Sequence, residues 1–178
     1  CLMTAQIANG GYAIKPKIIV DSNPISYEDA KQSMESGLLF DTDSEELLDK
    51  KLFKNQRNIK IVQEAMFAST NERFGTSYKS RIDDPKYQFA GKTGTAQVKR
   101  ITEAERELDR ELEQIPYKER DHAWFIAFGP YKNPRYALTV LVEHGGSGSS
   151  AAAPIAKKLF KKIIDRHEER EKIRKEKI

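Results

Sequence analysis

The sequence predicts an α+β fold in which helices flank a single antiparallel β-sheet. Three segments in the second half of the chain alternate apolar with polar residues and are rich in β-branched and aromatic types. They are residues 88–98, 122–130 and 135–146, and the short turn from Pro130 to Pro134 makes the last two a hairpin. Helical patterns precede and follow these strands, which favours a sheet covered by helices.

Composition limits the class of protein. The chain has 178 residues, of which 38% are hydrophobic and 33% are charged, and this is enough for one domain with its own core. No apolar run approaches the ~20 residues of a membrane-spanning helix. The only cysteine is Cys1, so a disulfide within the chain is excluded.

The net charge of +4 is unevenly distributed along the chain. Residues 157–178 hold ten Lys or Arg against five Asp or Glu, whereas the other 156 residues hold 21 against 22. The excess positive charge therefore lies in one tail, which argues against a surface that binds nucleic acid. The lysine cluster at 157–162 is interpreted as a solvated helix face rather than as a contact for acidic lipid.

The first half of the chain is predicted from helical spacing and from breakers. Residues 1–9 have the pattern of a helix end without an initiator Met, so we expect the chain to be cut from a larger protein. Residues 12–20 are predicted as an edge strand or two short strands, because Pro16 interrupts them. A helix capped by Asn58 follows. Its apolar face holds Ile59, Val62, Ala65 and Met66.

A charged insert at residues 99–120 separates the first two strands. Thr102 followed by Glu105 is a capping box, and the helix that it begins has one thin apolar stripe. The stripe consists of Leu108, Leu112 and Ile115, and we expect this helix to lie over the body as an appendage. A closing helix from about Ser150 has a broad apolar face, and residues 166–178 are expected to be a solvated, frayed tail.

Residues 89–97 read FAGKTGTAQ, and the Gly-Lys-Thr within them fits two incompatible interpretations. A phosphate-binding loop needs Gly-x-x-x-x-Gly-Lys followed by Ser or Thr, but the position of the first Gly is occupied by Lys86. Such a loop must also open a helix, whereas the residues after Gly94 continue with β character. The nucleotide-binding interpretation therefore fails on both counts.

On a strand, the same residues form a binding surface. A period of two puts Thr93 and Thr95 on one face, with Gly94 between them on the other. Two neighbouring hydroxyls beside the charge of Lys92 are suited to hold a carboxylate. The backbone N–H of Thr95 is suited to form half of an oxyanion hole, and losing such a donor typically costs about 3–4 kcal/mol of transition-state stabilisation.

The wider context of the Lys-Thr-Gly strengthens this interpretation. The segments MTAQIANGGYAIKPKII, AGKTGTAQV and RDHAWFIAFGPYKNPRYALTVLVEHGGSG, followed by a closing helix, resemble the C-terminal part of the transpeptidase domain of class B penicillin-binding proteins. Within that class they are most similar to the elongation type. The resemblance covers most of the chain and is weakest at residues 21–57, 99–120 and 166–178.

The resemblance implies a partial β-lactamase/transpeptidase-like fold, with residues 1–178 as the C-terminal portion of the domain. In that family a Ser-x-x-Lys motif, a Ser-x-Asn motif and Lys-Thr-Gly converge on one cleft. The serine attacks the D-Ala-D-Ala amide of a peptidoglycan stem peptide, and the acyl group then passes to an amine on a neighbouring strand. β-Lactams mimic the dipeptide and trap the serine.

Carried over residue by residue, Lys92, Thr93 and Gly94 are the expected catalytic residues, and Thr93 and Thr95 the expected substrate-binding residues. Lys92 would supply charge and support proton relay, while the N–H of Thr95 would face the acyl oxygen. The implied partners are stem peptides, β-lactam antibiotics and other cell-elongation membrane proteins, with no cofactor. The implied location is the periplasmic side of the bacterial inner membrane, with an anchor upstream of this chain.

The nucleophile of that mechanism is not found in the sequence. No serine in the chain has a lysine three positions later, so we expect the nucleophile to lie outside it and the chain alone to be inactive. Residues 69–71 match Ser-x-Asn but lie too close before Lys92, and they are interpreted as a helix terminus. Ser147 nearly completes Gly-x-Ser-x-Gly, but Ser149 replaces the last Gly, which favours a turn that caps the closing helix.

Other polar and aromatic side chains give weaker signals. His122 and Trp124 begin the second strand and are candidates for shaping the cleft, although both also suit an ordinary sheet. His144 and His167 have no ligand partners at metal spacing, so no metal site is predicted.

Alternative functions remain open at this point. A serine β-lactamase or a penicillin-sensing receptor domain shares the Lys-Thr-Gly sheet, but the long charged insert and the TAQV continuation favour the transpeptidase. A non-catalytic scaffold or partner-binding module is the third interpretation. A partial domain would also expose apolar surface, which gives such a chain a route to self-association.

Overall fold

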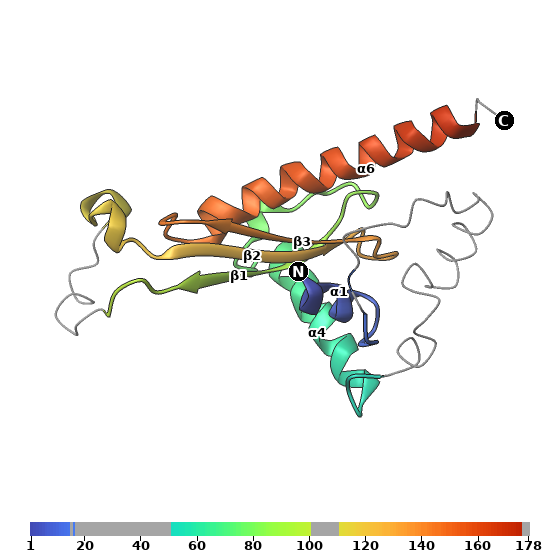
Figure 1. The fold of residues 1–178 in the computed structure, drawn as a ribbon, viewed down its shortest axis with the longest axis horizontal. Helices are drawn as coiled ribbons and strands as arrows, with labels where there is room; N and C mark the ends of the chain where they lie inside the picture. The colour runs from blue at the N-terminus through green and yellow to red at the C-terminus, as the bar shows by residue number, and fades with distance from the viewer. Residues whose placement is uncertain (15, 17–50, 101–110, 176–178) are drawn as a thin grey trace.

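The computed structural model describes residues 1–14, 16, 51–100 and 111–175. The described elements form three layers: one long helix, a three-stranded antiparallel sheet, and two helices on the opposite face (Figure 1). The sheet has the order β1-β2-β3, from strands Ala90–Ala96, His122–Gly129 and Tyr136–Val142. The predicted α+β fold with adjacent antiparallel strands is confirmed. Each outer strand has 7 residues and is shorter than the predicted ranges 88–98 and 135–146.

Strand register decides which side chains share a face of the sheet. Thr93 lies opposite Phe125 and Thr95 lies opposite Ala123, whereas Gly94 lies opposite Trp124. Phe125 and Ala123 belong to the core beneath the long helix. Since paired residues in antiparallel strands point to the same face, both threonines lie on the face that this helix covers.

The long helix α6, Ala153–Lys175, covers one face of the sheet because its apolar residues recur every three or four positions. Its buried residues are Ala153, Ala156, Phe160 and Ile164. The ring of Phe160 stacks on that of Phe89, with ring centroids 4.9 Å apart, and Phe89 meets Phe125 edge-on. These three rings form the centre of the larger core.

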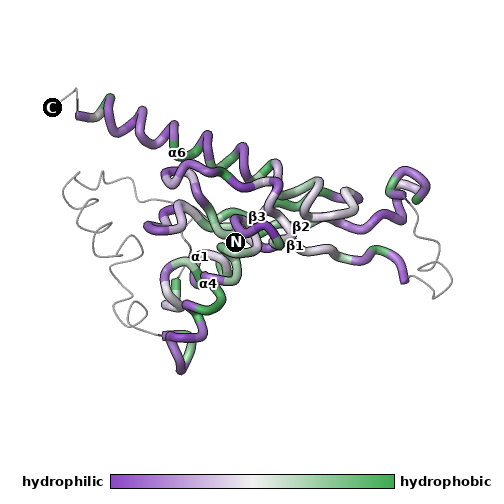
Figure 2. Tube along the Cα trace, turned by 180° about the vertical axis from the view of Figure 1, so that it is seen from behind, coloured by the Kyte–Doolittle hydropathy of each residue, from purple (hydrophilic) through white to green (hydrophobic). Residues whose placement is uncertain are grey.

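The helix α6 extends further than the sequence pattern indicated, because it continues through residues 166–175. Figure 2 shows that these last turns are mostly hydrophilic, which is why apolar spacing could not reveal them. Polar contacts support them instead: Lys86 Nζ donates to Glu168 Oε2 at 2.6 Å, and His167 Nε2 lies 2.8 Å from Glu171 Oε1. The sequence pattern indicated a regular helix only to about residue 165, whereas the structure describes helix up to Lys175; the expected fraying of this end stays a prediction.

The opposite face of the sheet is covered by α1, Leu2–Ala8, and α4, Gln56–Asn71 (Figure 1). The cap of α4 is Asn55 rather than the predicted Asn58, since the Asn55 side chain accepts a hydrogen bond from Arg57 N at 3.0 Å. The predicted apolar face is only partly buried. Ile59 and Met66 are in the interior, but Val62 is 39% exposed and Ala65 is also exposed.

Of the charged insert, the structure describes residues 99–100 and 111–120. The predicted capping box and Leu108 lie outside the described residues, as do most of the predicted strand at 12–20 and the last three residues, 176–178. Leu112 and Ile115 do not continue one helix, because two short 3₁₀ turns, Leu112–Gln114 and Tyr117–Glu119, occupy this stretch. No helix in the described part of the chain is long and apolar enough to cross a membrane.

Candidate active site on the edge strand

Strand β1 places the Lys-Thr-Gly-Thr segment on an edge of the described sheet, because β2 pairs with only one side of it. Lys92 is exposed, and its ammonium bends back over the strand. Nζ of Lys92 donates to the carbonyl oxygen of Thr93 at 2.8 Å and to Oγ1 of the same residue at 3.2 Å. The positive charge is therefore held beside the Thr93 hydroxyl.

A chain of hydroxyl groups extends from this ammonium. Oγ1 of Thr93 lies 3.2 Å from Oγ1 of Thr76, which lies 3.3 Å from Oγ of Ser69. Because an ammonium group only donates, Thr93 Oγ1 accepts from Lys92, and its own proton is free to be donated to Thr76 or to a ligand. The arrangement presents a hydroxyl donor next to a fixed cation, which suits a carboxylate.

Side chains at the end of α4 fix the start of β1. The buried hydroxyl of Thr70 donates to the carbonyl oxygen of Gly91 at 3.4 Å. The amide of Asn71 donates to the carbonyl oxygens of Phe67 and Phe89, both at 3.0 Å. Residues 69–71 thus form the helix terminus that the sequence analysis predicted, and the Asn71 amide is occupied by backbone contacts.

The turn before α6 packs closely against the middle of β1 and β2. Gly148 has no room for a side chain, because a Cβ atom would lie 2.3 Å from the carbonyl oxygen of Trp124 and 2.8 Å from that of Gly94. Ser147 caps this turn, and its Oγ accepts from Ser149 N at 3.3 Å. In the described part of the chain Ser147 Oγ has only Ser149 as a side-chain partner, which fits the predicted turn rather than a nucleophile.

The histidines near the strand ends make structural contacts. Nδ1 of His122 accepts from the backbone N of His144 at 2.9 Å. Nδ1 of His144 lies 2.9 Å from the carbonyl oxygen of Arg120, and it must donate there because a carbonyl only accepts. Trp124 lies opposite Gly94, away from the face of Thr93, so its predicted role in the cleft stays a prediction. The described His, Cys, Asp and Glu residues form no group of three that could hold a metal ion.

Thr76 is the residue of this site that sequence reasoning missed. It lies in the loop between α4 and β1, seventeen positions before Thr93, and no motif marks it. Only folding brings its hydroxyl to the strand. The Thr76 hydroxyl also links the hydroxyl of Ser69 to that of Thr93, although Ser69 itself belongs to a helix terminus.

The described part of the chain thus places Lys-Thr-Gly-Thr on the edge strand of an antiparallel sheet that lies between helices. The family model described as penicillin binding protein transpeptidase domain matches residues 2–161, and the chain belongs to this family. The expected resemblance to penicillin-binding proteins is confirmed by this match.

Individual relatives agree with the family. The chain is 38% identical over 105 residues to peptidoglycan D,D-transpeptidase MrdA of Salmonella typhimurium. This alignment covers 59% of this chain and 16% of that protein. It is 42% identical over 95 residues to MrdA of Haemophilus influenzae, and this second alignment covers 53% of this chain and 14% of that protein. The chain therefore spans only a small part of the length of these relatives.

Solved structures give the same result for the fold. A crystal structure of Pseudomonas aeruginosa PBP2 in complex with WCK 5153 matches with a TM-score of 0.57 and 30% identity, covering 87% of this chain and 27% of that chain. A complex between PBP2 and MreC from Helicobacter pylori matches with a TM-score of 0.53 and 32% identity, covering 65% of this chain and 19% of that chain.

Proposed function

We propose that residues 1–178 supply the Lys-Thr-Gly side of the active site of a peptidoglycan D,D-transpeptidase, as the C-terminal portion of its transpeptidase domain. The observation that carries this proposal is the edge strand with Lys92 held on Thr93. The family membership and the D,D-transpeptidases among its relatives support it. The nucleophilic serine lies outside residues 1–178, since no serine of the sequence has a lysine three positions later.

In this proposal the strand binds the carboxylate at the end of the substrate. Thr93 and Thr95 point to the same face, and Thr93 keeps a free proton because its oxygen accepts from Lys92. Hydrogen bonds to an ionised acceptor are roughly twice as strong as neutral ones. A terminal D-Ala carboxylate, or the carboxylate of a β-lactam, is the ligand that this pair of hydroxyls would take.

The strand would also stabilise the reacting centre. The serine oxygen attacks the D-Ala-D-Ala amide, the terminal D-Ala leaves with a proton, and an amine of a second stem peptide then takes the acyl group. The N–H of Thr95 would donate to the oxygen on which negative charge develops. Lys92 contributes a positive charge beside that oxygen, and Gly94 keeps the strand free of a side chain between the two threonines.

The natural partners follow from this chemistry. Stem peptides are the substrate and β-lactams the inhibitors, while other cell-elongation membrane proteins are the expected assembly partners. A solved relative supports the last point, since the Helicobacter pylori PBP2 structure is a complex with MreC. Peptidoglycan as substrate places the domain on the periplasmic side of the bacterial inner membrane, held by an anchor upstream of this chain.

Acylation of the full-length protein by a fluorescent penicillin tests the proposal. We expect Lys92→Ala to lower the acylation rate by about a hundredfold or more, the usual loss when one preorganised electrostatic group is removed. Thr95→Val should lower it by roughly tenfold, because one hydroxyl donor to the carboxylate is lost. Lys132→Ala, which removes an exposed lysine from the turn between β2 and β3, is the matched control and should leave the rate unchanged.

Two results would contradict the proposal. Equal acylation rates for Lys92→Ala and Lys132→Ala would show that the edge strand is not part of the reacting site. Rapid hydrolysis of the penicilloyl adduct in the unsubstituted protein would indicate a β-lactamase, because a transpeptidase stays acylated when no acceptor amine is present.

A further inference from the structure

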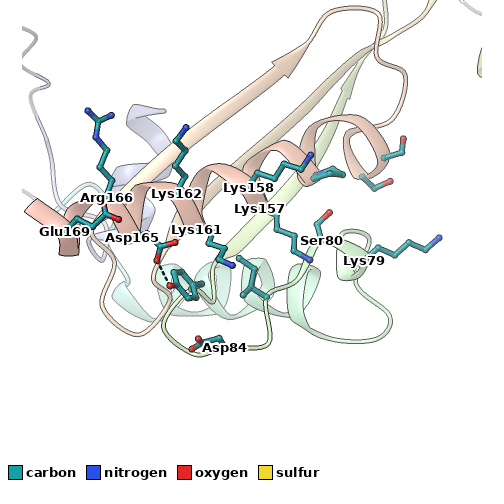
Figure 3. A pocket seen from close by; sticks show the side chains of 15 residues that line it. Lys79, Ser80, Asp84, Lys157, Lys158, Lys161, Lys162, Asp165, Arg166 and Glu169 are labelled. Carbon is teal, nitrogen blue, oxygen red and sulfur yellow. Dashed lines mark hydrogen bonds between the residues drawn. The ribbon is translucent and has the colours of Figure 1, made fainter.

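A groove with a volume of about 1160 Å³ runs between the first half of α6 and the segment 79–87 that leads into β1 (Figure 3). Its apolar wall consists of Ile82, Pro154 and the ring of Tyr87. Hydroxyl groups of Ser80 and Ser149 line it as well. None of these residues belongs to the Lys-Thr-Gly strand, so the groove is separate from the site described above.

Positive side chains without partners surround this groove. Five come from α6 and one from the facing segment: Lys157, Lys158, Lys161, Lys162, Arg166 and Lys79. None of the six makes an ion pair with a carboxylate of the described residues, whereas Lys86 next to them pairs with Glu168 at 2.6 Å. Figure 3 shows Lys157 and Lys161 reaching from α6 toward the facing segment.

The acidic residues of the lining do not neutralise these charges. Asp84, Asp165 and Glu169 also line the groove, so the lining holds six cationic against three acidic side chains. Asp165 accepts a hydrogen bond from the Tyr87 hydroxyl, and this bond raises the pKa of Tyr87. The side chain of Asp84 accepts from Lys86 N at 2.9 Å, which directs it toward its own loop.

The spacing of the lysines fits an extended peptide. Lys157 and Lys161 are four residues apart on a helix, which corresponds to about 6 Å along its axis. Alternate side chains of an extended strand are roughly 6.6–6.8 Å apart and point to the same side. Acidic side chains at alternate positions would therefore meet successive lysines, while the residues between them would face Ile82 and Tyr87.

We propose that this groove docks an acidic peptide segment of a partner protein in extended conformation, with carboxylates at alternate positions and apolar residues between them. The unpaired cations supply the charge complementarity, and the apolar wall supplies contact for the intervening side chains. A flat membrane surface would reach the outer lysines but not the concave wall formed by Ile82 and Pro154. The proposal goes beyond the catalytic one, and neither depends on the other.

Fluorescence anisotropy with the full-length protein tests this proposal. The probe is a labelled short peptide with Glu at alternate positions and Val between them, and the control probe carries Gln in place of each Glu. We expect the Glu peptide to bind and to be released by salt, and the Gln peptide to bind much more weakly. The double variant Lys157→Glu/Lys161→Glu should weaken binding of the Glu peptide by about tenfold, since exposed charge pairs contribute modestly and are here reversed.

A matched variant separates the groove from general electrostatics. The double variant Lys132→Glu/Lys172→Glu changes the net charge equally at exposed positions outside the groove and should bind as the unsubstituted protein does. If the Glu substitutions in the groove lower thermal stability, Lys157→Gln/Lys161→Gln provides the same test with a smaller expected loss. Penicillin acylation should be unchanged in every variant, so a failure here is distinguishable from a failure of the catalytic proposal.

Three results would overturn the proposal. They are equal weakening by both Glu double variants, equal binding of the Glu and Gln peptides, and groove-dependent binding to vesicles that contain phosphatidylglycerol without any binding of the Glu peptide. The last result would assign the lysines to a membrane surface instead.

Discussion

The two faces of the sheet differ in how completely the described residues cover them. On the α6 face nine residues form a buried cluster, and Phe125 and Phe160 within it have no exposed surface. On the α1 and α4 face, three of the described residues form such a cluster: Met66, Ala90 and Phe128. Large apolar side chains on that side stay accessible, including Met3 at 58% and Phe53 at 44% exposure.

This difference indicates on which face the described residues bury their own apolar side chains. The α6 layer buries its apolar stripe within the chain itself, so most of the stabilisation from apolar burial arises there. On the other side, Met3, Phe53 and Val62 line an open apolar hollow of about 170 Å³. An apolar surface of this kind is a site for further packing, so we expect mutations on the two faces to have unequal effects.

The largest expected effect is on the α6 face. Phe160→Ala should lower the free energy of unfolding by about 3–5 kcal/mol, because it removes a fully buried ring that stacks on Phe89. Val62→Ala on α4 should cost less than about 1 kcal/mol, since Val62 is 39% exposed. Urea denaturation followed by circular dichroism measures both. Similar losses for the two variants would remove the distinction between the faces.

A medium effect is expected from the two glycines of β1. A Cβ at Gly91 would lie 2.3 Å from Cζ of Phe125, on the filled side, so Gly91→Ala should cost about 1–3 kcal/mol. A Cβ at Gly94 would lie 3.3 Å from Cβ of Trp124, and Gly94→Ala should cost less than about 1 kcal/mol. Thermal unfolding of the two variants provides the comparison. A greater loss for Gly94→Ala would show that the open side is the more tightly packed.

The smallest effect concerns the end of α6, beyond the sheet. The hydrogen bond from His167 lowers the pKa of Glu171 from its ordinary value of 4.5. A carboxylate with a lowered folded-state pKa contributes stability above pH 4.5, and this contribution is lost as pH falls through the folded pKa. Because Glu171 is 48% exposed, we expect only a few tenths of a kcal/mol.

Comparison of Glu171→Gln with the unsubstituted protein measures this contribution. Stability curves recorded on both sides of pH 4.5 should differ above that pH and converge below it. A difference that grows as the pH falls would have the wrong sign and would rule out the His167–Glu171 pair as its source.

The sequence could predict the elements whose signals are local. Alternation located all three strands, with ends within two residues except that the third strand stops at Val142 rather than 146. Period two correctly placed Thr93 and Thr95 on one face. It could not distinguish Asn55 from Asn58 as the cap of α4, because both are good caps close to the same apolar pattern. The sequence could not predict the length of α6 either, because its last turns depend on contacts with residues distant in the chain, such as Lys86.

The candidate site shows the same limit. The Lys-Thr-Gly-Thr strand could be predicted because its motif is contiguous in the sequence, and the structure places it on an accessible edge of the described sheet. Thr76 and the cationic groove could not be predicted from the sequence, because each depends on segments that only the fold brings together. The roles proposed for Lys92, Thr93 and Thr95 in catalysis and binding stay predictions.

The central claim is that β1 forms one side of a reacting site whose nucleophile lies outside residues 1–178. Mass-spectrometric mapping of the full-length protein after incubation with penicillin tests it most directly. We predict a single penicilloyl adduct on a serine that has a lysine three positions later and that does not belong to this chain. An adduct on Ser69, Ser147 or any other serine of residues 1–178 would contradict the claim and would place the complete reacting site within this chain.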